Sequence, residues 1–342
     1  MGDTPHLRLD VAVAQANIDA MGAHAARLGV ALRPHAKTHK SVELAGRQLA
    51  AGAVGLTVAT IGEAEVFAAG GATDLFIAYP LWPDAEALGR LHRLAGKVRL
   101  GIGCDSAEAG RRLAGVAAEL LVEVDSGHHR SGVAPSAAGR LAAELAGLGH
   151  EVGGVFTFPG HAYAPGARQT AALDEAAALR TAAAGLVAQG LAAGRTSGGS
   201  TPSAEFADPA VVDELRPGVY VFGDAQQLEL GTITAGQVAL TVVATVVSHA
   251  GGRVVADAGS KALGADRAPW ASGHGRLLDA PDARLVALSE HHVTIEWPGR
   301  LPALGSHLLV VPNHVCNAVN LADRYVLSTG GTWSVDARGR NS

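Results

Sequence analysis

The sequence contains little cysteine, few aromatic residues and little charge. Its two cysteines, Cys104 and Cys316, cannot build a disulfide framework. Aromatic residues make up 4% and charged residues 17% of the 342 residues, whereas apolar residues make up 48%. This composition is typical of a compact globular chain and excludes a disordered one. A net charge of -5 gives no electrostatic reason to expect nucleic acid as a partner.

Long apolar runs are also missing. Runs such as Leu240–Val247 are short and β-branched, so they predict buried strands and no membrane span. The first residues, MGDTPHLRLD, lack the basic start and the apolar core of a signal peptide. Together with the scarcity of cysteine, this predicts a cytoplasmic protein with no membrane partner.

The first two-thirds of the chain alternates short apolar segments with segments rich in alanine and leucine. The predicted strands are Gly29–Leu32, Val54–Val58, Asp74–Ala78, Val98–Ile102, Leu120–Val124, Gly154–Thr157, Arg195–Ser197 and Val219–Phe222. The predicted helices are Val42–Ala51, Gly62–Ala69, Pro83–Ala95, Ser106–Ala117, Ser136–Leu148 and Arg168–Gln189. Eight strands alternating with helices predict an α/β fold, a closed (β/α)8 barrel with functional groups on the loops after the strands. An open doubly wound sheet is the alternative.

After Gly231 the pattern changes to β-branched runs separated by Gly and Pro turns, which predicts a second, all-β domain. These runs are Val238–Val247, Arg253–Asp257, Arg284–Ala287, His292–Trp297 and Leu308–Val311.

The run RPHAKTHKS places Lys37 where an apolar strand ends, because Pro34 prevents further ladder hydrogen bonds. Desolvation near the strand end and the neighbouring cationic residues both favour the uncharged amine. A free amine can condense with an aldehyde, which is how pyridoxal phosphate is held in proteins. His35 would then lie beside the same pocket. A solvated basic turn is the plainer interpretation of this lysine taken alone.

Two further loops carry polar residues after predicted strands. In EVDSGHHRSGV, Arg130 can hydrogen-bond an oxyanion, or it can simply pair with Asp125. In FTFPGHAY, the turn at Pro159-Gly160 directs His161 and Tyr163 toward a substrate or cofactor pocket, although both can equally be structural.

A glycine-rich turn, SGGSTPS, offers unobstructed backbone amides and hydroxyls before Pro202, which makes it a candidate anion site or an ordinary turn. In RPGVYVFGD, Gly218 and Tyr220 follow, and Tyr220 can also be a core aromatic.

The run PNHVCN contains His314 and Cys316. If the segment is extended, side chains two positions apart point the same way, so both can reach one ion. A thiolate with an imidazole favours zinc over magnesium, and two protein ligands leave positions open for substrate, as in a catalytic site. A buried thiol beside an unrelated histidine is the alternative. Glu290, His291 and His292 in LSEHH are expected to support such a site from a neighbouring strand.

In combination, RPHAKTHKS, EVDSGHHRSGV, SGGSTPS, RPGVYVFGD and PNHVCN resemble the D-threonine aldolase and D-serine dehydratase family of pyridoxal phosphate enzymes, relatives of alanine racemase called fold type III. The resemblance runs from Thr4-Pro5 to about Asp323. It implies a pyridoxal-phosphate-binding (β/α)8 barrel over residues 11–230 and a β domain formed by residues 1–10 and 231–342. It also implies a homodimer, with the β domain of one chain near the barrel mouth of the other.

The resemblance also assigns roles to residues. It implies that Lys37 carries the cofactor, that Arg130 faces its phenolic oxygen, and that phosphate lies near Ser200 and Thr201 with a second contact from Gly218 to Tyr220. It places a divalent metal at His314 and Cys316, with zinc favoured and manganese or magnesium possible. The aldolases of the family carry His-x-Asp at this place and the dehydratases His-x-Cys, so this chain matches the dehydratases.

The activity that follows is a lyase reaction on 3-hydroxy-D-amino acids, with dehydration of the D-serine dehydratase type slightly favoured. The alternative is retro-aldol cleavage to glycine and an aldehyde. A racemase would need an acid-base group on the far face of the cofactor, and Tyr325 is the only tyrosine after Gly231. A non-catalytic pyridoxal phosphate carrier would not need the second domain, and a metal-only hydrolase would bind no pyridoxal phosphate.

Overall fold

The structure, a computed structural model, describes residues 3–342. Its chain divides into two compact units. The sheet unit contains the chain up to Asp19, Thr38–Glu43 and Val219–Gly339, and the barrel unit contains Ala20–Lys37, Leu44–Gly218 and Arg340–Ser342. No helix among the described residues is both long enough and apolar enough to cross a membrane.

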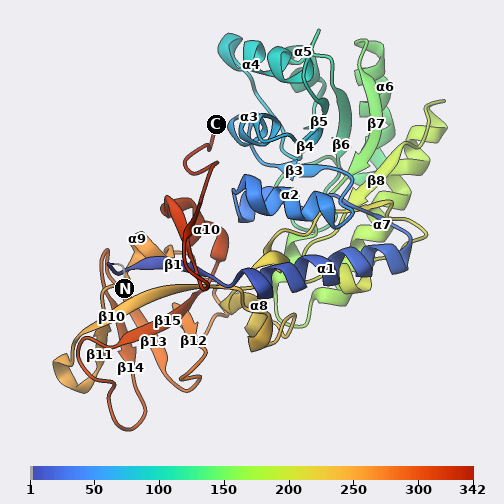
Figure 1. Cartoon of the computed structure of the whole chain (residues 1–342). Coiled ribbons are helices and arrows are strands. Elements are labelled where there is room, and N and C mark those ends of the chain that lie inside the picture. Colours follow the sequence, from blue (N-terminus) through green and yellow to red (C-terminus); the bar gives the residue numbers. More distant parts are fainter. Residues whose placement is uncertain (1–2) are drawn as a thin grey trace. The chain divides into compact units, whose positions relative to one another are not determined.

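The barrel unit is built on parallel strands, eight in the described part of the chain (Figure 1). They are β2 (Ala31–Leu32), β3 (Leu56–Val58), β4 (Asp74–Ile77), β5 (Arg99–Cys104), β6 (Glu119–Glu123), β7 (Glu151–Phe156), β8 (Arg195–Gly198) and β9 (Glu214–Leu215), in the order β2-β9-β8-β7-β6-β5-β4-β3. Backbone hydrogen bonds also connect the two edges of this sheet, near β2 and β3. Val54 N donates to Leu32 O at 2.9 Å, and Thr57 N donates to Pro34 O at 2.8 Å. The predicted closed barrel is therefore confirmed.

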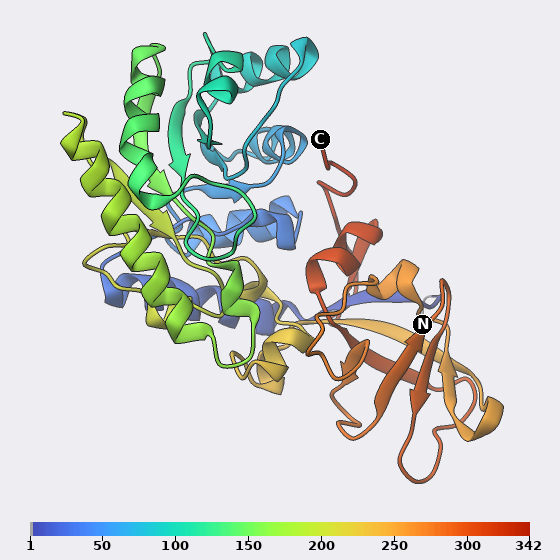
Figure 2. The same cartoon turned by 180° about the vertical axis from the view of Figure 1, so that it is seen from behind.

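Helices alternate with these strands along the chain. They are α1 (Val11–Leu28), α2 (Val42–Ala50), α3 (Ile61–Ala69), α4 (Ala85–Ala95), α5 (Ala107–Arg112), α6 (Ala138–Gly147), α7 (Arg168–Ala188) and α8 (Ala225–Glu229). Helices α3, α4 and α5 begin after Thr60, Asp84 and Ser106. The side-chain oxygen of each of these residues accepts a hydrogen bond from the backbone amide three residues later in the chain. Figure 2 shows α6 and α7 side by side on the outside of the barrel.

One predicted barrel strand was wrong. Val219–Phe222 is not the eighth strand, because Val219–Val221 forms a short 3-10 helix. The strand that completes the barrel is β9, which pairs with both β8 and β2. A run of buried β-branched and aromatic residues has the same sequence pattern in a strand and in a short buried helix, so the pattern alone could not separate the two.

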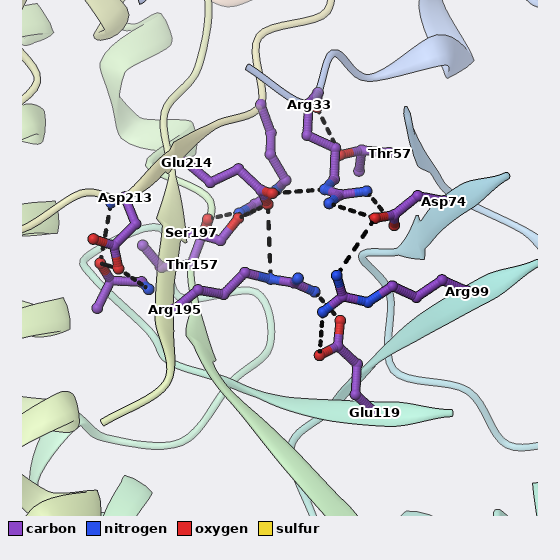
Figure 3. Close-up of polar contacts among 12 residues, drawn as sticks. Arg33, Thr57, Asp74, Arg99, Glu119, Thr157, Arg195, Ser197, Asp213 and Glu214 are labelled. Atoms are coloured by element: carbon purple, nitrogen blue, oxygen red, sulfur yellow. Dashed lines mark hydrogen bonds and ion pairs between the residues drawn. The ribbon is translucent and has the colours of Figure 1, made fainter. Parts of the chain in front are cut away.

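The amino ends of the barrel strands carry a network of charged side chains, which are largely buried except for the exposed Arg99 (Figure 3). Asp74, Arg99, Glu119, Arg195 and Glu214 are each the first residue of their strand. Arg33 joins them, 2.6 Å from Asp74 and 2.7 Å from Glu214. Space for these side chains comes from glycine, since a Cβ on Gly101 would lie 3.3 Å from Arg195 Nη2. In barrels of this kind the chemistry is expected at the carboxyl ends of the strands. We therefore assign the charges at the amino ends to the stability of the barrel.

The sheet unit contains a second sheet, with nine strands within the described range. They are β1 (His6–Leu9), β10 (Leu240–Ser248), β11 (Val254–Ala256), β12 (Gly275–Leu277), β13 (Arg284–Leu288), β14 (Val293–Glu296), β15 (His307–Pro312), β16 (Arg324–Leu327) and β17 (Thr332–Ser334), with helices α9 (Ser260–Leu263) and α10 (Val315–Leu321). The N-terminal strand β1 lies inside this sheet, antiparallel to β10 and parallel to β16. The five predicted β runs all contain strands, whereas β1, β12, β16 and β17 were not predicted from periodicity.

Candidate active site

Lys37 lies directly after the carboxyl end of β2. The strand stops before Arg33 and Pro34, and Lys37 occupies a short 3-10 helix, Ala36–Thr38. Its side chain is half-buried, and Nζ lies 5.7 Å from the centroid of the Phe158 ring. His35 is beside it, with Nδ1 3.5 Å from the Lys37 amide nitrogen. An amine at this edge of a barrel stands where such folds carry their chemistry.

Phe158 is the centre around which several predicted site residues gather. Its ring lies 5.2 Å from the Arg130 guanidinium, 5.5 Å from the His128 ring and 6.3 Å from the Tyr163 ring. The Lys37 Nζ atom also lies over the Phe158 ring. The sequence analysis did not assign Phe158 a role, although it directly follows the β7 strand segment and Thr157. The parallel strands β2, β6 and β7 bring these loops to one edge of the barrel.

The alternative pairing of Asp125 with Arg130 was wrong. Asp125 Oδ2 lies 2.7 Å from His129 Nδ1, and its Oδ1 accepts from the backbone amides of Gly127 and His129. Although burial raises it, these hydrogen bonds lower the pKa of Asp125 to about 2. Arg130 is 3.9 Å from Glu123 and half-exposed, so its guanidinium keeps donors for another anion.

His161 lies in the short 3-10 helix Gly160–Tyr163 and is oriented by a carboxylate. Its Nε2 is 3.3 Å from Asp174 Oδ2. Its Nδ1 is buried and has no hydrogen-bond partner among the described residues. A buried polar nitrogen without a protein partner is consistent with its prediction as a pocket residue.

The predicted phosphate turn follows β8. Ser200, Thr201 and Ser203 are all buried, and Ser200 N donates to Ser203 Oγ at 3.0 Å. The amide of Gly199 is already used, since it donates to Glu175 Oε1 on α7 at 2.6 Å. Gly199 has a φ of +81°, which glycine adopts readily. The turn is therefore a set of buried hydroxyls whose backbone is fixed from outside the barrel by Glu175.

The predicted second phosphate contact lies after β9. Gly218 ends the barrel unit and Tyr220 lies in the short 3-10 helix that follows, where its side chain is buried. Before Gly218, Arg216 is buried and donates to Thr157 O at 2.5 Å and also to Ser197 Oγ. Burial lowers the pKa of Arg216 to about 10, against the raising effect of Glu214 and the other nearby carboxylates.

His314 and Cys316 lie in the sheet unit at the start of α10. The expectation of an extended segment was wrong, because only His314 is extended and Cys316 is in the first turn of the helix. His314 Nδ1 lies 3.8 Å from Asp224 Oδ2, and Cys316 is buried with Sγ 3.3 Å from Thr38 Oγ1. Asp224 also accepts from Gln227 N and Val315 N, so it joins the starts of α8 and α10.

Asp224 was missed by the sequence analysis. It is fully buried, and burial raises its pKa to about 6 although His314 lowers it. A carboxylate facing one imidazole nitrogen is the usual support of a metal-binding histidine, because it leaves the other nitrogen for the metal. The sequence signal was available, since an aspartate directly before the helical run AQQLE is a typical N-cap.

The donor set at this place suits a metal with open positions. No group of three or more His, Cys, Asp or Glu side chains that could enclose an ion is found among residues 3–342. The imidazole of His314 and the thiol of Cys316 are donors of the types that zinc takes, and a site with only two protein ligands would leave other positions for water or substrate. Glu290 and His291 do not join them, because they are exposed and Glu290 pairs with Lys261 at 2.5 Å.

A closed barrel with a half-buried lysine after its first strand and buried hydroxyls after a late strand defines the alanine racemase-like class. Residues 9–226 match the family described as "Alanine racemase, N-terminal domain", and residues 239–328 match "Putative serine dehydratase domain". The first match covers more than half of the chain, which therefore belongs to the alanine racemase family.

Two curated relatives match over most of their length. D-threo-3-hydroxyaspartate dehydratase of Delftia sp. strain HT23 is 37% identical, covering 92% of this chain and 91% of that protein. D-threonine aldolase of Arthrobacter sp. is 36% identical, covering 98% and 93%. The solved structure of the Delftia dehydratase has a TM-score of 0.89 at 34% identity and covers 98% of this chain and 97% of its own.

That dehydratase was also solved as two variants, one with a histidine and one with a cysteine replaced by alanine. The two replaced residues are two positions apart, and the cysteine variant was solved in a metal-free form.

Proposed function

We propose that this chain is a pyridoxal-phosphate-dependent lyase for 3-hydroxy-D-amino acids, and that it dehydrates them. One observation carries the choice of dehydration. His314 and Cys316 have the same residue types and the same spacing as the histidine and cysteine replaced in the D-threo-3-hydroxyaspartate dehydratase variants, of which the cysteine variant was solved in a metal-free form. Family membership supports the broader class of lyase, since the relatives are named as a dehydratase and an aldolase.

The barrel unit would hold the cofactor. Lys37 provides the amine, Arg130 an oxyanion partner, and the turn after β8 the buried hydroxyls of Ser200 and Thr201, with Gly218 and Tyr220 as the second phosphate contact. Tyr163 would lie near the pyridine ring, and His35 and His161 near the substrate. Pyridoxal phosphate, when bound, withdraws electrons from the substrate Cα and so makes bonds at that carbon easier to break.

Chain residues then divide the work. Lys37 Nζ would be the base that takes the proton from the substrate Cα. His314 and Cys316 would hold a divalent metal, which would supply Lewis-acid chemistry at the β-hydroxyl, so that hydroxide would be a better leaving group. Zinc suits a thiolate ligand better than manganese or magnesium does. Loss of water followed by hydrolysis gives an oxo acid and ammonia.

Retro-aldol cleavage is the second candidate, because a D-threonine aldolase is 36% identical over 98% of this chain. In that reaction the β-hydroxyl loses its proton and the bond between Cα and Cβ breaks, giving glycine and an aldehyde. The same lysine and metal pair would serve, so the products decide between the two reactions.

Racemisation is disfavoured because the chain after Gly231 offers no suitable tyrosine. Tyr325 is the only tyrosine after Gly231, and it is fully buried with its hydroxyl donating to His39 O. Burial raises the pKa of Tyr325 well above its ordinary value, which makes it a poor proton carrier at neutral pH. A non-catalytic carrier is disfavoured by the match of residues 239–328 to the serine dehydratase domain.

A product assay tests the proposal. The protein, loaded with pyridoxal phosphate and Zn²⁺, is incubated separately with D-serine, D-threonine and a 3-hydroxy-D-aspartate. We expect oxo acid and ammonia from at least one of them and none from the L-isomers. Glycine with an aldehyde would assign the aldolase reaction instead, and inversion at Cα with loss of neither water nor an aldehyde would refute the lyase.

A further inference from the structure

Thr38, the residue after Lys37 in the chain, touches one of the two proposed metal ligands. Its Oγ1 lies 3.3 Å from Cys316 Sγ, and both side chains are buried. Thr38 and Cys316 belong to the same compact unit. Buried polar groups keep the partner within their reach, because water is not available to replace it. The contact therefore fixes Thr38 against the start of α10.

The next two residues are anchored in the same unit. His39 O accepts a hydrogen bond from Tyr325 on β16. Lys40 O accepts from Ala337 N at 2.9 Å, and Lys40 Nζ donates to Ala337 O at 3.4 Å. Lys40 has a φ of 48°, which a residue other than glycine rarely adopts unless its surroundings hold it there. Three successive residues after Lys37 are thus held by three different segments, and the Thr38 contact involves a proposed metal ligand.

We propose that Thr38 is a positioning residue that couples metal binding at His314 and Cys316 to retention of the cofactor on Lys37. The inference rests on the proposed function, because it takes those three residues as the metal pair and the cofactor lysine. A hydroxyl can accept a hydrogen bond from a thiol, as it does here, and can equally donate one to a metal-bound sulfur.

The coupling follows from two constraints on Thr38. Hydrogen-bond partners of a metal ligand fix the direction in which that ligand points, and losing such a partner typically weakens metal binding about 10- to 100-fold. Lys37 and Thr38 lie in the same short 3-10 helix, Ala36–Thr38, so fixing Thr38 narrows the backbone conformations open to Lys37. A metal that stabilises the Cys316–Thr38 contact therefore stabilises the lysine position that holds the cofactor, and by linkage the cofactor strengthens metal binding by the same factor.

The test measures binding and not turnover. The dissociation constant of pyridoxal phosphate is measured from its visible absorbance, with and without saturating Zn²⁺, and that of Zn²⁺ by competition with a chromophoric chelator. We expect Zn²⁺ to tighten cofactor binding about 5-fold or more in the wild type. In Thr38→Val, Zn²⁺ affinity should fall about 10-fold or more and the coupling factor should fall to about 1.

Two variants serve as controls. Thr38→Ser keeps the hydroxyl and should keep both the Zn²⁺ affinity and the coupling. Thr241→Val removes another buried hydroxyl, one with no hydrogen-bond partner among the described residues, and should behave as the wild type. If Thr38→Val does not fold, as judged by circular dichroism, Thr38→Ala takes its place, and the wild-type coupling factor remains decisive.

The outcomes separate this inference from the proposed function. A wild-type coupling factor of 1, or a Thr38→Val protein with unchanged Zn²⁺ affinity and coupling, overturns the role of Thr38 while a Zn²⁺-dependent lyase activity would still stand. A wild-type protein that binds no Zn²⁺ and still converts its substrate overturns both the inference and the metal part of the proposed function.

Discussion

Glu175 shows how a single buried carboxylate outside the barrel sheet can shape the turn that we assign to the phosphate. Its Oε1 accepts a hydrogen bond from Gly199 N, and a Cβ on Gly198 would collide with the same oxygen. Burial raises the pKa of Glu175 from 4.5 to about 7, against the lowering effects of the Gly199 hydrogen bond and of Arg216. The proton on this residue therefore affects folding stability near neutral pH.

We predict that Glu175→Gln flattens the pH dependence of stability. The folded state binds the Glu175 proton more tightly than the unfolded state, so this group's contribution to stability is present below pH 4.5 and is lost as pH rises through about 7. Glutamine keeps the acceptor for Gly199 and does not titrate. At pH 8 the variant should be more stable than the wild type by up to about 3 kcal/mol, measured by urea unfolding. Parallel profiles from pH 5 to 8 would contradict this.

At Cys316, the division of labour between cofactor and metal can be tested directly. Cys316→Ala should lose at least about 100-fold in turnover, because the metal is assigned several kcal/mol of transition-state stabilisation. At a saturating concentration of pyridoxal phosphate, which allows for the weaker binding expected without the metal, its visible cofactor absorbance should persist, since the cofactor residues lie in the other unit apart from Tyr220. Cys104→Ala is the matched control, a buried thiol on β5 whose partner is Ser106 O. Wild-type turnover in Cys316→Ala after exhaustive chelation would remove the metal from the mechanism.

Single residues differ in how far the sequence could predict them. Lys37 could be proposed from the sequence because a proline ends the strand directly before a cationic run, and His314 and Cys316 could be proposed because of their spacing. Asp224 could have been predicted from its N-cap pattern but was not assigned. Phe158 could not have been predicted, because its importance comes from the convergence of the loops after β2, β6 and β7, which no local sequence pattern encodes.

At the scale of elements, the charge network at the amino ends of the strands links sequence to barrel stability. Glu119 on β6 is bonded to Arg195 on β8 and lies 3.4 Å from Arg99 on β5. Glu119 and Arg195 are largely buried, with 8% and 18% of their side chains exposed. Removing one member of a buried pair leaves the other charge without compensation.

We therefore expect Glu119→Gln to lower the free energy of unfolding by about 3 kcal/mol. The matched control is Glu108→Gln, because Glu108 pairs with Arg111 on the exposed surface of α5 and should change stability by less than about 1 kcal/mol. Chemical denaturation of the two variants side by side decides the point. Equal losses, or no loss in Glu119→Gln, would mean that the network does not stabilise the barrel.

Element boundaries were predictable only where the local pattern was unambiguous. Helices with a capping residue, such as α4 after Asp84, began within two residues of the predicted position. The final barrel strand was misplaced because β9 has only two residues, and its identity depends on pairing with β2 and β8. The prediction of an extended conformation from His314 to Cys316 was wrong because α10 begins at Val315. Asp224 supports this helix start by accepting a hydrogen bond from the Val315 amide.

For the whole molecule, we predict a homodimer. The family resemblance implies one, and the barrel unit exposes two large aromatic side chains after β4, Tyr79 at 53% and Trp82 at 63%. Exposed aromatic residues of this kind are characteristic of interfaces. Light scattering after size exclusion should give twice the mass of the chain, and Trp82→Glu should shift the equilibrium toward monomer. A fully active monomer in the wild type would contradict the prediction.

The central claim is that Lys37 holds pyridoxal phosphate, and borohydride reduction tests it most directly. The loaded protein is reduced, digested and mapped by mass spectrometry. We expect the phosphopyridoxyl group on the peptide that contains residues 35–39, attached to Lys37, and no labelling in Lys37→Ala. A label on Lys40 or Lys261, or no label at all, would contradict the account.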